Sequence, residues 1–100
     1  MTTSIPPTSA DRFLPVAPFW WVTNFGGVVL TGVLAAATDW LPLWLIFGGA
    51  VALHVGEAIY AYRAARAAGF TGSALRWALQ TLGVGFPSLQ ALRLARADND

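Results

Sequence analysis

The chain has 100 residues, of which 56% are hydrophobic and 11% are charged, and its formal net charge is +1. Globular domains carry about 25% charged residues, so this chain has too few charges to cover a surface that faces water. The apolar content excludes a disordered chain, and the length excludes a second large domain. The absence of cysteine excludes a disulfide framework, and the small net charge gives no indication of a nucleic-acid partner.

The first 18 residues are rich in threonine, serine and proline. Proline lacks an amide donor and restricts the backbone, so this composition predicts a flexible N-terminal segment over residues 1–18. Pro18, at the end of the segment, suits the first turn of a helix, where the missing donor is not needed.

Three apolar stretches follow, and a membrane-spanning helix needs about 20 mostly apolar residues. Residues 19–38 contain no charge, and residues 41–62 are interrupted only by His54 and Glu57. The third stretch, residues 77–92, is shorter, but snorkelling of the flanking arginines extends it to a full span. The sequence therefore predicts an all-α membrane protein with three transmembrane helices over residues 19–94, followed by a polar tail over residues 95–100.

The connection between the first two helices contains Asp39 and Pro42. We expect Asp39 to cap the N-terminus of the second helix and Pro42 to lie in its first turn. So short a connection predicts that helices 1 and 2 form a tight antiparallel hairpin. Gly69 is predicted to end the second helix, and Ser73 to cap the third.

The arginines predict the orientation, because positive residues favour the cytoplasmic side of a membrane. With three spans, four arginines lie on the N-terminal side and two on the C-terminal side. This predicts a cytoplasmic N-terminus in the cell or inner membrane. If the third helix does not span, both termini and all the arginines lie on the cytoplasmic side. The arginines are Arg12, Arg63, Arg66, Arg76, Arg93 and Arg96.

Two other interpretations account for part of the pattern. Residues 1–37 resemble a signal peptide, but their apolar stretch is longer than the 7–15 residues typical of such segments. A soluble helical protein that hides its apolar faces by oligomerising is the other interpretation. The span lengths favour the membrane over both.

A polar stripe runs along the second helix, where His54, Glu57 and Tyr60 recur every three residues. An ionisable group at the centre of a membrane helix costs about 2.5–3.5 kcal/mol, so Glu57 needs a partner. An antiparallel third helix brings Arg76, Trp77 and Gln80 to this stripe. We expect Gln80 to donate to the Glu57 carboxylate and Arg76 to pair with it.

Two glycines, Gly83 and Gly85, are predicted at the depth of His54, where they leave room for a ligand or for close helix packing. The cluster either locks helices 2 and 3 together or carries ligand or proton chemistry, and the sequence leaves both open. One histidine and one glutamate form only half of a metal site, so no metal and no cofactor are expected.

Small residues form two rows at four-residue spacing, which lets helix backbones approach closely in lipid. We expect the rows to face each other within the hairpin. The alternative is that one row binds a helix of a partner protein. The rows are Gly27, Thr31 and Ala35 on the first helix, and Gly48, Ala52 and Gly56 on the second.

The run Leu-His-Val-Gly-Glu over residues 53–57, followed by Tyr60, resembles a motif of the transmembrane protein 254 family. Residues 77–81 (Trp-Ala-Leu-Gln-Thr) and, more loosely, residues 85–89 (Gly-Phe-Pro-Ser-Leu) are also similar to it. The resemblance covers about residues 50–90. It implies a small three-span membrane protein with no established activity, and it includes His54, Glu57, Tyr60, Trp77 and Gln80.

Three functions are compatible with these observations. The first is a non-enzymatic accessory or scaffold subunit of a membrane assembly, whose partner is another membrane protein or a second copy of the chain. The second is a lipid- or sterol-binding protein whose pocket is lined by His54, Glu57 and Gln80. The third and weakest is an intramembrane isomerase that uses His54 and Glu57 as acid and base.

Overall fold

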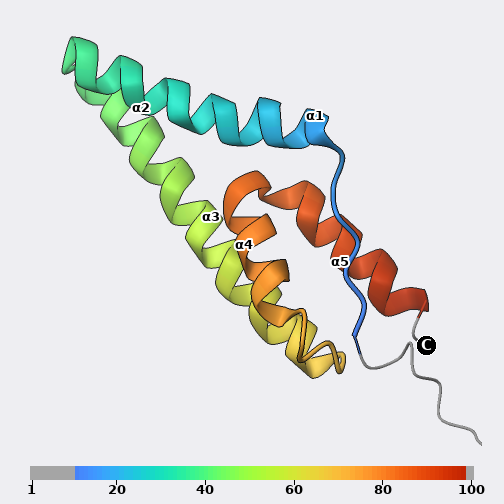
Figure 1. Ribbon diagram of the computed structural model, residues 1–100. Coiled ribbons are helices and arrows are strands. Elements are labelled where there is room, and N and C mark those ends of the chain that lie inside the picture. The colour runs from blue at the N-terminus through green and yellow to red at the C-terminus, as the bar shows by residue number, and fades with distance from the viewer. Residues whose placement is uncertain (1–10, 99–100) are drawn as a thin grey trace, which may run out of the picture.

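The computed structural model describes residues 11–98, which form helices and connecting segments without any strand. The first helix covers residues 18–38 without a break in the chain path (Figure 1). It consists of α1 (Pro18–Trp20), the π-helical stretch η2 (Trp21–Phe25) and α2 (Gly26–Thr38). Pro18 lies in the first turn, as predicted.

The second helix, α3, covers Leu41–Ala67 and is about 40 Å long at 1.5 Å per residue. It ends at Gly69 as predicted, because Gly69 has a φ of 92°. The Gly69 N–H donates to Arg66 O (3.0 Å) and the Phe70 N–H donates to Ala65 O (2.8 Å). This pair of bonds is a Schellman motif, which satisfies carbonyl groups at the end of the helix.

The connection between α2 and α3 makes a sharp corner at residues 39–40 (Figure 1). Asp39 adopts a φ of 50°, and its N–H donates to Ala35 O (2.7 Å). Its carboxylate accepts from the indole of Trp44 (3.0 Å). Asp39 therefore ends α2, and the prediction that it caps α3 is wrong. The residue at that cap position is Trp40, whose side chain makes no capping bond.

The two long helices meet near the corner and diverge from it, and α4 and α5 lie in the opening (Figure 1). Near the corner, a Cβ atom added at Gly32 would lie 2.7 Å from the Phe47 ring, so glycine permits the close approach there. The predicted tight hairpin is thus not confirmed along the full length of the helices.

The third apolar stretch is not one membrane-spanning helix. It forms α4 (Ala74–Val84) and α5 (Phe86–Asp98), which are separated by Gly85. Gly85 has φ 73° and ψ −130°, a conformation that residues with a side chain rarely adopt. Neither helix is long enough to span, and the described residues contain two candidate spans, Pro18–Thr38 and Leu41–Ala67. Because α5 continues to Asp98, most of the predicted polar tail is helical.

The packed core lies at the open end of the molecule, where α4 and α5 contact α3. Small alanines on α3 let the other helices approach, and Trp77 and Leu92 fill the space above them. The segment over residues 11–17 also packs there through Phe13 and Leu14. The rest of the segment that was predicted to be flexible, residues 1–10, lies outside the described part. The buried core residues are Ala61, Ala65, Phe70, Ala74, Trp77, Leu92 and Ala95.

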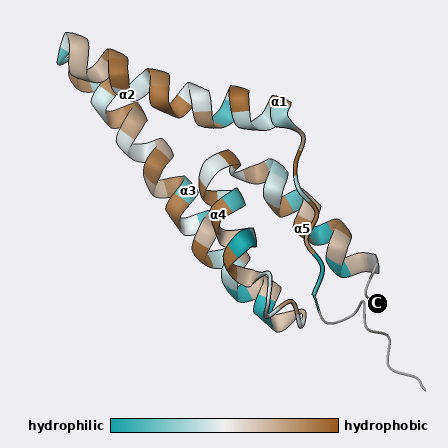
Figure 2. Cartoon of the chain, in the orientation of Figure 1, coloured by the Kyte–Doolittle hydropathy of each residue, from teal (hydrophilic) through white to brown (hydrophobic). Residues whose placement is uncertain are grey.

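Most of the two long helices is not buried by the rest of the chain. Only 6% of the most apolar window of each is buried, and apolar residues cover their outer surfaces (Figure 2). The core helix of a soluble monomer would be mostly buried. Lipid or another protein must therefore cover these surfaces, as in a membrane protein.

The structure predicts which parts of the chain share one side of a membrane. If only the two long helices span, residue 97 at the end of α5 lies on the same side as loop residue 71, and residue 40 lies on the other. The chain has no cysteine, so single cysteines can be introduced at Trp40, Thr71 and Ala97, all exposed. We expect an impermeant maleimide to label Thr71→Cys and Ala97→Cys from one side and Trp40→Cys from the other. Labelling of residues 40 and 97 from the same side would restore the three-span prediction.

Candidate functional site

The C-terminal end of α4 is held by polar side chains from both long helices. His54 Nδ1 lies 2.8 Å from the carbonyl oxygen of Leu82, and Asn24 Nδ2 donates to Val84 O (2.7 Å). The last carbonyls of a helix have no partner within the helix, and such groups are costly to leave unpaired in lipid. His54 and Asn24 thus supply hydrogen bonds that let α4 end within the depth of the long helices.

Glu57 lies beside this helix end, close to Gly85. A Cβ atom added at Gly85 would lie 3.2 Å from Glu57 Oε1 and 3.2 Å from His54 Nε2, so both side chains approach the same glycine. Both side chains are half-buried. Within residues 11–98, the Glu57 carboxylate makes no hydrogen bond and no ion pair. The space that was predicted at Gly85 for a ligand or for helix packing is thus occupied by side-chain atoms of His54 and Glu57.

Gln80 lies in a different place from the one predicted. Its side chain is 4% exposed and points to the N-terminal segment. Its Oε1 accepts from the Val16 N–H (2.9 Å), and its Nε2 donates to Leu14 O (3.2 Å) and Ser88 Oγ (3.1 Å). The expected hydrogen bond from Gln80 to Glu57 is therefore wrong. An irregular segment leaves its backbone groups unpaired, and one amide side chain satisfies a donor and an acceptor together.

Trp77 and Arg76 belong to the same packing against the N-terminal segment. The fully buried Trp77 donates through Nε1 to Arg12 O (2.8 Å), and its ring lies 5.0 Å from that of Phe13. The Arg76 guanidinium stacks 4.5 Å above the Phe13 ring, where it makes a cation–π contact. The expected ion pair between Arg76 and Glu57 is therefore wrong.

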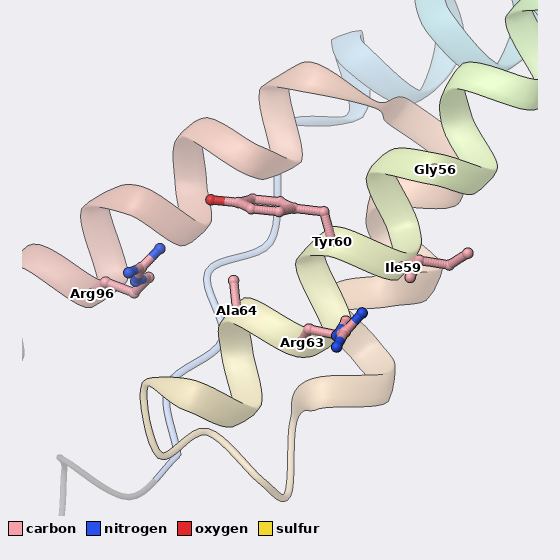
Figure 3. A pocket seen from close by; sticks show the side chains of 6 residues that line it. All are labelled: Gly56, Ile59, Tyr60, Arg63, Ala64 and Arg96. Atoms are coloured by element: carbon pink, nitrogen blue, oxygen red, sulfur yellow. The ribbon is translucent and has the colours of Figure 1, made fainter.

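The predicted polar cluster thus divides into two parts. His54 and Glu57 lie on α3 at Gly85, whereas Trp77 and Gln80 are hydrogen-bonded to the backbone of residues 12–16. Tyr60 belongs to neither part: it is 56% exposed and reaches from α3 toward α5 (Figure 3).

Sequence reasoning missed two polar residues that contribute to this arrangement. Asn24 is the single side-chain amide in the first span, which contains no charged residue. Its isolation in the sequence could have indicated that it has a structural partner. Ser88 accepts from Thr81 Oγ1 (2.8 Å) as well as from Gln80, which ties α5 to α4 across Gly85. Both Ser88 and Thr81 are fully buried, although hydroxyl residues of this kind are usually exposed.

The predicted rows of small residues do not face each other. Gly27, Gly48 and Gly56 have open space where a Cβ atom would lie, and Ala52 is exposed. On the first helix only Ala35 is buried. The α3 alanines that pack against other helices lie on another face of the helix: they are Ala58, Ala61 and Ala65.

Close packing around the end of α4 depends instead on Gly83. A Cβ atom there would overlap the Trp21 ring, so glycine is required for the contact between α4 and the first helix. Beside this contact lies a cavity of about 170 Å³ that is apolar apart from His54. Within residues 11–98, no group of three or more His, Asp or Glu side chains is placed to hold a metal ion.

Two long apolar helices with unburied surfaces and a short helical pair packed into their opening define a small helical membrane protein. The chain belongs to the family described as transmembrane protein 254, whose model matches residues 1–95. The match confirms the family indicated by the sequence motifs and extends it over both spans. Comparisons with curated proteins and with solved structures gave no match.

Proposed function

We propose that the protein is a non-enzymatic accessory subunit that binds a transmembrane helix of another membrane protein along the α3 row of Gly48, Ala52 and Gly56. One observation carries this proposal: the glycines of this row have open space around them, whereas Gly32, Gly83 and Gly85 are closely packed. Glycine in a helix costs about 0.5–1 kcal/mol relative to alanine, and the fold of this chain makes no use of it at Gly48 or Gly56. In lipid, such rows bring helix backbones together.

The same face of α3 favours a different protein over a second copy. Arg63 lies seven residues after Gly56, and residues seven apart share one face of a helix. A parallel pair of identical chains would bring two Arg63 side chains together, and that repulsion opposes self-association. The arginines favour a cytoplasmic location for the end of the molecule that carries both the N-terminal segment and α5.

Gly48→Leu tests the proposal, because a leucine at this position separates α3 from a docked helix while leaving the isolated fold intact. In a mild-detergent purification with mass spectrometry, we expect the partner to fall to about a tenth of its wild-type amount or less. Gly49→Leu is the matched control: it makes the same change one residue on, about 100° around the helix, where a Cβ also meets open space. A wild-type chain that purifies without a stoichiometric partner protein, or equal partner loss in both variants, contradicts the proposal.

Glu57 favours a second candidate function, a lipid- or sterol-binding protein. A half-buried carboxylate that lacks a partner within residues 11–98, inside a candidate span, favours a polar ligand at that depth. Such a site would consist of His54 and Glu57 without Gln80, whose side chain is bonded to the N-terminal segment. In the same purification, one enriched lipid that is lost in Glu57→Gln would support this candidate. The apolar lining of the cavity beside His54 gives little support to acid–base isomerisation.

A further inference from the structure

A groove of about 580 Å³ lies between α3 and α5, at the end of the molecule remote from the corner. It is separate from the polar site at Gly85. Arg96 on α5 and Arg63 on α3 lie toward its two ends, with Tyr60 and Ala64 between them (Figure 3). Gly56 and Ile59 complete the lining.

The positive charge of this groove comes from two arginines, one on each helix. Among the described side chains, those of residues 11–97, neither Arg63 nor Arg96 makes an ion pair, a hydrogen bond or a contact with an aromatic ring. Two other arginines, by contrast, lie over rings: Arg66 is 5.8 Å from the centre of the Tyr62 ring, and Arg76 stacks on Phe13. The lining includes no acidic residue, so the groove presents two guanidinium groups and a phenol to any ligand.

The lining also changes character with depth along α3. Arg63 lies near the end of the helix, whereas Gly56 lies seven residues, or about 10 Å, closer to the middle of the span. Between them, Ile59 adds an apolar side chain. The groove is therefore cationic at the depth of lipid headgroups and apolar at the depth of the first acyl carbons, and Gly56 leaves room there for a chain.

We propose that this groove binds an anionic phospholipid, with the anionic headgroup lying between Arg63 and Arg96 beside Tyr60 and an acyl chain over Gly56 and Ile59. Guanidinium groups form strong, directional hydrogen bonds with phosphate oxygens. A free phosphate would use the cationic part alone, and the apolar part of the groove favours the lipid. The groove shares Gly56 with the helix-docking row, whereas the headgroup side chains Arg63, Arg96 and Tyr60 are not part of that row.

The test measures lipid binding by native mass spectrometry of the full chain in mild detergent. The probes are dioleoylphosphatidylglycerol, dioleoylphosphatidylcholine and inorganic phosphate. We expect the wild type to bind one equivalent of phosphatidylglycerol in preference to phosphatidylcholine. The double variant Arg63→Gln/Arg96→Gln is expected to bind phosphatidylglycerol about tenfold more weakly or worse, because it loses two charges near the headgroup.

The matched control is Arg66→Gln/Arg93→Gln, which loses the same charge from the same two helices outside the groove. It is expected to retain wild-type affinity. Circular dichroism and melting temperature establish that both double variants fold, so that a loss of binding reflects the groove. Equal weakening in both variants, or equal wild-type binding of the two lipids, overturns the proposal. Binding of inorganic phosphate that matches the binding of phosphatidylglycerol would assign the site to a soluble anion and overturn the lipid assignment.

Discussion

Replacing Gly85 by alanine is expected to lower the free energy of unfolding by about 2–4 kcal/mol. The conformation at φ 73° is strained for any residue with a Cβ, at a cost of about 1–3 kcal/mol. The new methyl group would also lie 3.2 Å from both His54 Nε2 and Glu57 Oε1. Displacement of His54 removes the hydrogen bond to Leu82 O and leaves that carbonyl unpaired at the end of α4.

Unfolding in detergent, followed by circular dichroism and tryptophan fluorescence, measures this loss. Gly49→Ala is the control, because Gly49 lies within α3 and a Cβ there meets nothing within 4 Å. Alanine is preferred over glycine in a helix by about 0.5–1 kcal/mol, so this variant should be unchanged or slightly more stable. A Gly85→Ala protein as stable as the control would mean that the break between α4 and α5 does not require glycine.

Gln80→Met is expected to release the N-terminal segment from α4. Methionine keeps the volume of the side chain but removes three hydrogen bonds, and it leaves the Val16 N–H and the Leu14 carbonyl without their partner. Each unpaired buried group costs about 1–3 kcal/mol, which predicts a total loss of about 2–4 kcal/mol because the released segment regains water. The melting temperature should fall accordingly.

Limited trypsin digestion gives a local readout, because Arg12 lies within the released segment. We expect cleavage after Arg12 to be several times faster in Gln80→Met than in the wild type, before the helices themselves unfold. Gln90→Met is the control, since Gln90 is exposed on α5 and no hydrogen bond joins it to the segment. If cleavage is unchanged in Gln80→Met, the remaining contacts of Arg12 and Phe13 with α4 are sufficient to hold the segment.

The parts of the fold that depend on local composition could be predicted from the sequence. Both long helices appear within one residue of their predicted starts, because a membrane requires about 20 uncharged apolar residues and few other segments meet that requirement. Gly69 ends α3 as expected, since glycine adopts the left-handed conformation that a helix end requires. The family was also evident from short motifs.

Several of the contacts expected within the predicted site are wrong. His54 and Glu57 do meet the α4 end, but the backbone partners of Gln80 and the ring partner of Arg76 come from residues 13–16, more than 60 positions away. Helical spacing places side chains on a face of a helix, and it does not show which segment covers that face. A proline-rich lead-in without regular structure gives no periodic signal of its own.

The sequence by itself determined that the chain is a small helical membrane protein, because its few charges and long apolar runs are suited only to lipid around most of its surface. The tertiary structure decided three further points. The third apolar stretch is divided at Gly85. Glycine permits the unusual φ at this position, and packing against α3 selects it. The tertiary structure used His54 and Asn24 to pair carbonyls at that break, and it left Glu57 and the α3 glycine row without partners among the described residues. These outcomes depend on contacts between segments that are distant in the chain. Hydropathy and residue spacing do not encode the geometry of such contacts.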